Sequence, residues 1–66
     1  MQVVLNGEER NLAAELTVTQ LLTNLELGSV PVLVERNGEA LFPRDYPQTH
    51  LADGDRLEIV RVVAGG

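Results

Sequence analysis

The sequence contains no cysteine and no lysine, and both absences restrict what this 66-residue chain can do. Without cysteine there is no disulfide, no thiolate nucleophile and no cysteine-ligated zinc site. Five arginines stand against ten acidic residues, which gives a net charge of −5. A chain of that sign repels nucleic acid and anionic lipid, and it suits a partner with a basic docking surface. We therefore expect neither a nucleic-acid partner nor a membrane partner.

Long apolar runs are missing as well. The first residues, Met1–Leu5, carry no basic side chain, and no apolar stretch approaches membrane-spanning length. The length suffices for one small domain, and an apolar content of 44% is typical of a globular protein. The sequence thus predicts a cytoplasmic domain that is a monomer when free.

The common patterns of catalytic and metal-binding residues are also absent. His50 has neither a second histidine nor a cysteine to complete a metal site. Asp53 and Asp55 flank Gly54, but the further oxygen ligands of a calcium loop are missing, so we interpret this stretch as a turn with solvated ends. No glycine-rich phosphate loop is present. We expect no metal site, no cofactor bound by this chain and no enzymatic activity of its own.

Two Asn-Gly pairs predict two β-hairpins, because both central positions of a type I′ turn need positive φ. Asn6-Gly7 follows an apolar, β-branched segment, and Asn37-Gly38 follows a second one. Between Pro43 and the last strand we expect an irregular crossing, since two prolines interrupt regular structure there. The predicted strands cover residues 1–5, 9–14, 32–36, 39–42 and 56–63.

One helix is predicted between the hairpins. Thr17 and Gln20 have the spacing of a capping box, in which each side chain satisfies a backbone donor near the other. Gly28 is predicted to end the helix in the left-handed conformation. The helix should bury one apolar stripe, formed by Val18, Leu21, Leu22 and Leu25.

The predicted order is β-β-α-β-β-β, which indicates a two-layer α+β domain. It fits a ubiquitin-like β-grasp fold, a mixed sheet of about five strands with one main helix packed on one face. In that fold the first and last strands lie side by side. The residues that we expect in the core between helix and sheet are Met1, Val3, Leu5, Leu21, Leu22, Leu25, Leu57 and Ile59.

The opposite face of the sheet is the predicted docking surface. Alternation that buries Leu57 and Ile59 turns the intervening residues of the last strand outward, and we expect them beside Val4 of the first strand. Exposed apolar side chains on adjoining strands often mark an interface. The residues predicted to dock a partner are Val4, Glu58, Val60, Val62, Val63 and Ala64.

The last three residues, Ala64-Gly65-Gly66, are predicted to form a flexible tail after a domain of residues 1–63. A Gly-Gly segment has no Cβ, so it can thread a narrow tunnel in any backbone conformation. The α-carboxylate of Gly66 could then be adenylated by an ATP-using enzyme and attacked by sulfide or a persulfide to give a thiocarboxylate. That chemistry requires no side chain of this protein. The alternative is an inert interaction domain with a frayed end.

Several motifs resemble the thiamine-biosynthesis sulfur carrier family, ThiS. They are the element order, the turn at residues 53–55, the segments 37–39 and 42–44, and the end at 64–66. The family often has a tryptophan slightly after the position of Tyr46, and the segment 44–51 is about one residue shorter here.

The resemblance implies three partners. An adenylating enzyme related to ubiquitin activators would use ATP and magnesium on Gly66, a cysteine desulfurase would supply the sulfur, and thiazole synthase would receive it. Relatives with the same terminal chemistry remain alternatives. One is the small subunit of molybdopterin synthase, which is usually longer, and others supply sulfur to tRNA or cysteine synthesis or are conjugated to proteins.

Overall fold

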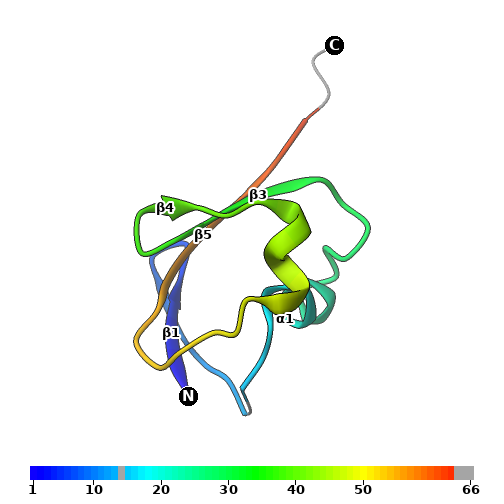
Figure 1. Cartoon of the computed structure of the whole chain (residues 1–66). Coiled ribbons are helices and arrows are strands. Elements are labelled where there is room, and N and C mark those ends of the chain that lie inside the picture. The colour runs from blue at the N-terminus through cyan, green and yellow to red at the C-terminus, as the bar shows by residue number, and fades with distance from the viewer. Residues whose placement is uncertain (14, 64–66) are drawn as a thin grey trace.

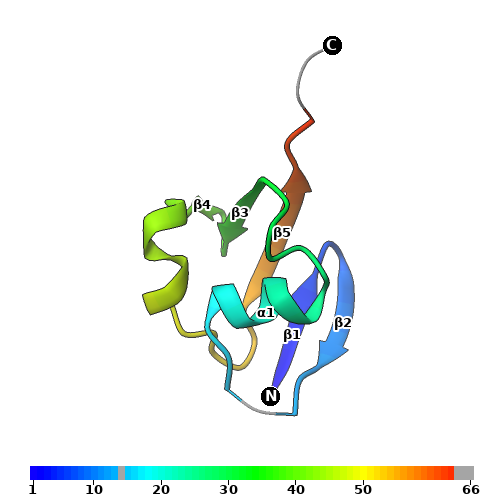
Figure 2. The ribbon, with the colours of Figure 1, turned by 90° about the vertical axis from the view of Figure 1, so that its right-hand side faces the viewer.

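The computed structural model describes residues 1–13 and 15–63, and it contains a five-stranded mixed sheet with one α-helix across one face (Figures 1 and 2). The strand order is β2-β1-β5-β3-β4, with β1 parallel to β5 and the other neighbours antiparallel. This confirms the predicted fold class and the pairing of the first and last strands. The elements are β1 (Gln2–Leu5), β2 (Glu8–Asn11), α1 (Val18–Asn24), β3 (Val32–Arg36), β4 (Glu39–Ala40), a 3₁₀ helix η1 (Pro43–Gln48) and β5 (Arg56–Arg61).

Both predicted hairpins are present, with positive φ at both turn residues. The angles are 48° and 82° at Asn6-Gly7, and 51° and 85° at Asn37-Gly38. The return strands are shorter than predicted. β2 ends at Asn11 because Asn11 pairs with Gln2, the first residue of β1. The next residue, Leu12, donates its N–H to the carbonyl of Met1, the first residue of the chain, at 2.7 Å. Residue 14, at the end of the predicted strand, lies outside the described residues.

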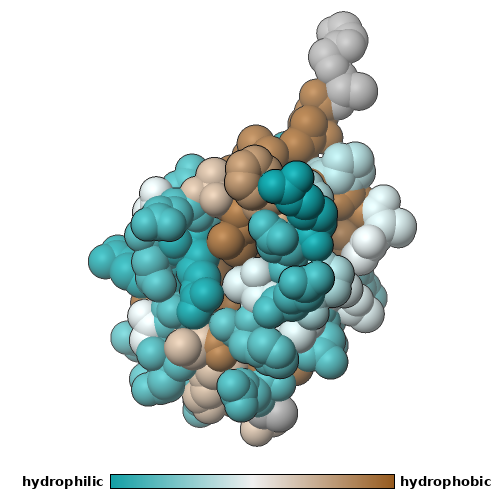
Figure 3. All heavy atoms as spheres, viewed as in Figure 1, coloured by the Kyte–Doolittle hydropathy of each residue, from teal (hydrophilic) through white to brown (hydrophobic). Residues whose placement is uncertain are grey.

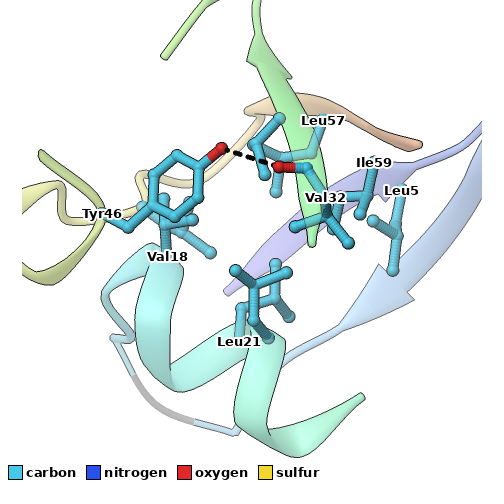
Figure 4. Close-up of a cluster of buried hydrophobic side chains, with 10 residues drawn as sticks. Leu5, Val18, Leu21, Val32, Tyr46, Leu57 and Ile59 are labelled. Atoms are coloured by element: carbon cyan, nitrogen blue, oxygen red, sulfur yellow. Dashed lines mark hydrogen bonds between the residues drawn. The ribbon is translucent and has the colours of Figure 1, made fainter. Parts of the chain in front are cut away.

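The segment after β4 is a 3₁₀ helix, so the prediction of an irregular crossing was wrong. Pro43 occupies the first turn, where its fixed φ suits a helix and its missing N–H costs nothing. The Asp45 N–H bonds the Phe42 carbonyl at 2.8 Å, which starts the turn. The helix buries Tyr46, whose hydroxyl donates to the Val32 carbonyl at 3.4 Å (Figure 4).

Helix α1 begins at the predicted capping box. The Gln20 N–H bonds Thr17 Oγ1 at 3.2 Å, and the Thr17 N–H bonds Gln20 Oε1 at 2.9 Å. The predicted end at Gly28 was wrong, because Glu26, with φ of 61°, takes the left-handed position. The Leu27 N–H then bonds the Leu22 carbonyl at 2.8 Å, and this turn packs Leu27 against the core.

Glu26 stands where glycine is favoured, and this gives a stability prediction. Replacing Glu26 by glycine should raise the free energy of unfolding by about 1 kcal/mol, because the left-handed conformation costs a residue with Cβ about that much. Urea denaturation measures the change. Glu26→Ala removes the same charge but keeps the Cβ, so it should leave stability nearly unchanged. If both variants raised the free energy of unfolding equally, the cause would be the loss of the Glu26 charge and not the left-handed conformation.

The core lies between α1 and the sheet, with η1 closing one side (Figures 2 and 4). Six of the eight predicted core residues are buried, and Met1 and Leu25 are partly buried against them. Val18, predicted in the buried stripe of the helix, is buried as well, and the core also includes residues that the prediction left out, namely Val32, Val34, Tyr46 and Leu51.

Asp55 is buried, so the prediction of a solvated turn was wrong for this residue. Its Oδ2 accepts from Arg36 Nε at 2.9 Å and from the Ala52 N–H at 2.8 Å, and its Oδ1 accepts from Asn37 Nδ2 at 3.1 Å. Asp55 therefore joins the turn before β5 to the end of β3. Asp53 is exposed and accepts from the Gln2 N–H at 2.7 Å.

Candidate functional site

Strand β5 is the central strand of the sheet, and it leads directly to the end of the chain (Figure 1). Past Arg61, the Val62 N–H still bonds the Pro31 carbonyl at 2.9 Å. Val63 is 84% exposed. Ala64, Gly65 and Gly66 lie outside the described residues, so their roles as tail, docking residue and reactive carboxylate stay predictions.

The sheet face opposite α1 carries a row of exposed apolar side chains. Val60 is 57% exposed, and it pairs across the strands with Leu33, which is 60% exposed. The β3–β4 register pairs residues 35 and 40, and continuing it places Phe42, 61% exposed, opposite Leu33. Val62, 47% exposed, extends the row just past the end of β5. We call Phe42, Leu33, Val60 and Val62 the apolar row.

Apolar surface is visible in the space-filling view from the middle of the molecule out to the end of β5 (Figure 3). Large exposed apolar side chains gathered on neighbouring strands are typical of an interaction surface rather than of scattered surface residues. The row lies at the same end of β5 as Val63. A partner that covers the row would therefore also be close to Val63, the last residue that the structure describes.

Two predicted docking residues lie outside the row. Val4 pairs with Arg56 at the inner end of β5, so among the outward residues of β5 it lies nearer Glu58 than Val60. Its side chain is half-buried. Glu58 is exposed and pairs with Glu35 of β3, which puts two carboxylates directly opposite each other next to the row. This edge of the row suits a partner with a basic surface.

Two members of the apolar row were missed in the sequence. Leu33 belongs to an apolar run that predicts a strand, and Phe42 ends the strand predicted after the turn, but neither is among the predicted docking residues. A hairpin turn fixes the register of its strands, so the Asn37-Gly38 turn already pairs Leu33 with Phe42. The guanidinium of Arg44 lies over the Phe42 ring, 4.9 Å from its centre, and holds this exposed ring by a cation–π contact.

The described part of the chain offers an exposed apolar surface and no metal centre. No group of three or more histidine, cysteine or acidic side chains in residues 1–13 and 15–63 is placed to hold a metal ion. Across those same residues, no helix has the length and apolar character needed to cross a membrane.

Comparison with known proteins gives matches along the whole chain. The ThiS family model matches residues 3–66. The sulfur carrier protein ThiS of Bacillus subtilis is 40% identical over 50 residues, covering 76% of each chain. The crystal structure of the thiamine biosynthesis protein ThiS from Geobacter metallireducens superposes with a TM-score of 0.86 at 33% identity, covering 100% of both chains.

A longer relative matches as well. The thiazole synthase of Paramagnetospirillum magneticum is 48% identical over 66 residues, which is 100% of this chain and 20% of that protein. This chain thus spans about a fifth of the length of that relative. The family match over residues 3–66 includes the Gly65-Gly66 pair.

Proposed function

This chain belongs to the ThiS family of sulfur carriers in thiamine biosynthesis, and from that premise we propose that the α-carboxylate of Gly66 is its sulfur site. The observation that carries the proposal is the family match, which extends through Gly66. Sulfur carriers of this kind are substrates rather than catalysts. The protein's part is to deliver its carboxylate to partner enzymes, and the partners supply the chemistry.

The first proposed step is adenylation. A carboxylate oxygen of Gly66 attacks the α-phosphorus of ATP on a partner related to ubiquitin activators, and pyrophosphate leaves with magnesium. The product is a mixed anhydride whose carbonyl carbon is now electrophilic, because AMP is a good leaving group. Gly65 has no Cβ, so the chain next to the reacting atoms can enter a narrow channel.

The second proposed step puts sulfur in place of oxygen. Sulfide attacks the carbonyl carbon and displaces AMP, which leaves a thiocarboxylate on Gly66. A protein persulfide instead gives an acyl disulfide, and a thiol must then cleave its S–S bond to release the thiocarboxylate. Cysteine, through a desulfurase, is the proposed origin of that sulfur.

Thiazole synthase is the proposed acceptor of the sulfur. The support is that a thiazole synthase contains a segment 48% identical to this chain along all 66 residues. A domain joined to an enzyme in one organism often acts with that enzyme as a separate chain in another. The thiocarboxylate is a soft nucleophile, which suits it to sulfur transfer onto a carbonyl-derived intermediate.

The exchange of labelled pyrophosphate into ATP tests the adenylation step. The full chain, the activating enzyme, magnesium and ATP are mixed, and label enters ATP only when an acyl adenylate forms reversibly. We expect exchange that depends on the carrier concentration. An inert interaction domain would give no exchange above the enzyme alone.

The apolar row is the proposed docking surface for the activating enzyme, and this gives a binding prediction. Val60→Asp should weaken the complex about tenfold or more, because it places a charge where an apolar side chain loses its water on binding. Calorimetry with the activating enzyme measures the dissociation constant. Since Val60 is exposed, the fold should remain intact.

Thr19→Asp is the matched control for that variant. Thr19 is exposed on α1, on the other side of the sheet, so the variant adds the same charge away from the row (Figure 2). We expect its affinity to equal that of the unchanged chain. Equal affinity of both variants would show that docking uses another surface.

A further inference from the structure

The outer end of β5 determines where the chain leaves the domain. On one side, β3 pairs with β5 as far as Val32–Arg61, and the Val62 N–H bonds the Pro31 carbonyl. On the other side, β1 pairs with β5 only at its inner end, through Val4–Arg56 and Leu5–Leu57. Beyond these pairs, the hydrogen bonds described between the first hairpin and the backbone of β5 come from one residue.

That residue is Asn6, the first residue of the hairpin turn. Its backbone N–H bonds the Leu57 carbonyl at 2.8 Å. Its Oδ1 accepts from the Ile59 N–H at 2.7 Å, and its Nδ2 donates to the Ile59 carbonyl at 3.2 Å. The amide thereby takes the place of a backbone peptide and extends the β1–β5 contact as far as Ile59.

Asn37, in the second hairpin, binds β5 in a related way at the opposite end. Its backbone N–H bonds the Arg56 carbonyl at 2.8 Å, and its Oδ1 accepts from the Arg56 N–H at 2.9 Å. Both asparagines have positive φ, so both turns tolerate glycine. The two residues bind β5 from its two neighbours, but Asn37 binds Arg56 at the inner end, whereas Asn6 binds Ile59 in the outer half.

We propose that Asn6 is a positioning residue for the reaction at Gly66: by fixing Ile59, it fixes the direction in which the chain leaves the sheet. The inference rests on the proposed function. Without the amide, the backbone of the outer half of β5 is hydrogen-bonded on the β3 side alone, and only the packing of Ile59 in the core remains on the side of the first hairpin. Docking through the apolar row and delivery of the carboxylate are then separable, because Asn6 is not part of the row.

Kinetics of the full-length Asn6→Gly variant test this separation in the pyrophosphate exchange assay. Glycine keeps the turn conformation and removes only the amide. The turnover number should fall about tenfold or more, since small misplacement of a reacting group carries a large kinetic penalty. The carrier concentration that gives half-maximal exchange should not change. Asn37→Gly is the matched control, and it should lower the thermal midpoint without changing the turnover number.

The outcomes distinguish this inference from the proposed function. If the unchanged chain supports exchange and Asn6→Gly turns over normally, the positioning role is wrong and the carrier function stands. If the unchanged chain gives no exchange, both are wrong. Hydrogen exchange of the unchanged chain provides a second measurement that needs no variant. The Ile59 amide should exchange slowly, and exchange as fast as an unprotected amide would overturn the contact with Asn6.

Discussion

Deleting Gly66 is expected to abolish pyrophosphate exchange on the activating enzyme while leaving thermal stability unchanged. The reacting group would then be the carboxylate of Gly65, one residue short of the α-phosphate. One extended residue spans about 3.3–3.6 Å, and a misplacement of even about 1 Å can cost about a hundredfold in rate. Stability should not change, because glycine has no side chain that could pack against the domain.

Two further measurements separate loss of the reacting carboxylate from loss of binding to the activating enzyme. The deleted chain should still bind the activating enzyme, because the apolar row is intact, so calorimetry should give an unchanged dissociation constant. Gly65→Val should likewise bind normally and be adenylated far more slowly, since it adds a branched side chain beside the reacting end. Exchange at the normal rate after the deletion would show that Gly66 is not the sulfur site.

Replacing Asp55 by asparagine is expected to cause a large loss of stability at neutral pH. The amide keeps the size of the side chain, but it removes the charge and turns one of the two acceptor oxygens into a donor. That oxygen is either Oδ2, which accepts from Arg36 and the Ala52 N–H, or Oδ1, which accepts from Asn37. Breaking a buried ion pair and leaving donors unpaired should cost about 3 kcal/mol. A small domain has only about 5–15 kcal/mol of stability in all, so the loss should be clear in urea denaturation.

The effect of Asp55→Asn should disappear in acid. Burial disfavours the charged form, but three donated hydrogen bonds and the positive charge of Arg36 outweigh that cost, so the pKa of Asp55 lies below its ordinary value of 3.8. When the pKa of an acidic group is lower in the folded state than in the unfolded state, its charge stabilises the fold at pH values above the unfolded-state pKa. This stabilisation is lost as pH falls through the folded-state pKa. As pH falls below 3.8, the difference in stability between the unchanged protein and the variant should therefore shrink, and it should vanish once pH is below the lowered folded-state pKa.

Asp53→Asn is the control for that variant, two residues away in the same turn. Asp53 is exposed, and an amide oxygen can still accept from the Gln2 N–H, so we expect little change in stability. If Asp55→Asn were as stable as the unchanged protein at neutral pH, the ion pair would contribute nothing. A difference that stayed constant at every pH would exclude the charge as its cause.

Local signals in the sequence predicted the elements that depend on neighbouring residues. The Asn-Gly pairs require positive φ within the turn itself, and the capping box joins Thr17 to Gln20 within one helical turn, so both could be recognised without the rest of the fold. The same hairpin logic also fixes the pairing of Leu33 with Phe42. The apolar row could therefore have been completed from the sequence.

Features that depend on distant residues could not be predicted in this way. Asp55 is buried because Arg36 and Asn37 reach it from another strand, and nothing next to Asp55 in the sequence indicates that. The helix ends early because a turn at Glu26 brings Leu27 back onto the core, although Gly28 is the better residue for such a turn.

The position of Val4 depends on the same kind of information. Two strands joined by a hairpin have a register set by the turn, but β1 and β5 are parallel and lie at opposite ends of the chain. Their relative shift follows from packing in the finished sheet. Alternation indicated that Val4 lies on the face away from the buried Val3 and Leu5, but it could not show that Val4 lies opposite Arg56 rather than farther along β5.

The most direct test of the sulfur-carrier role is the intact mass of the chain purified from its native host while thiamine is being made. We predict a form that ends at Gly66 and is heavier than the sequence by the difference between one sulfur and one oxygen atom. That form should be absent when the activating enzyme is deleted. Only the all-oxygen mass under active thiamine synthesis, or a chain that continues past Gly66, would contradict the assignment of the Gly66 carboxylate as the sulfur site.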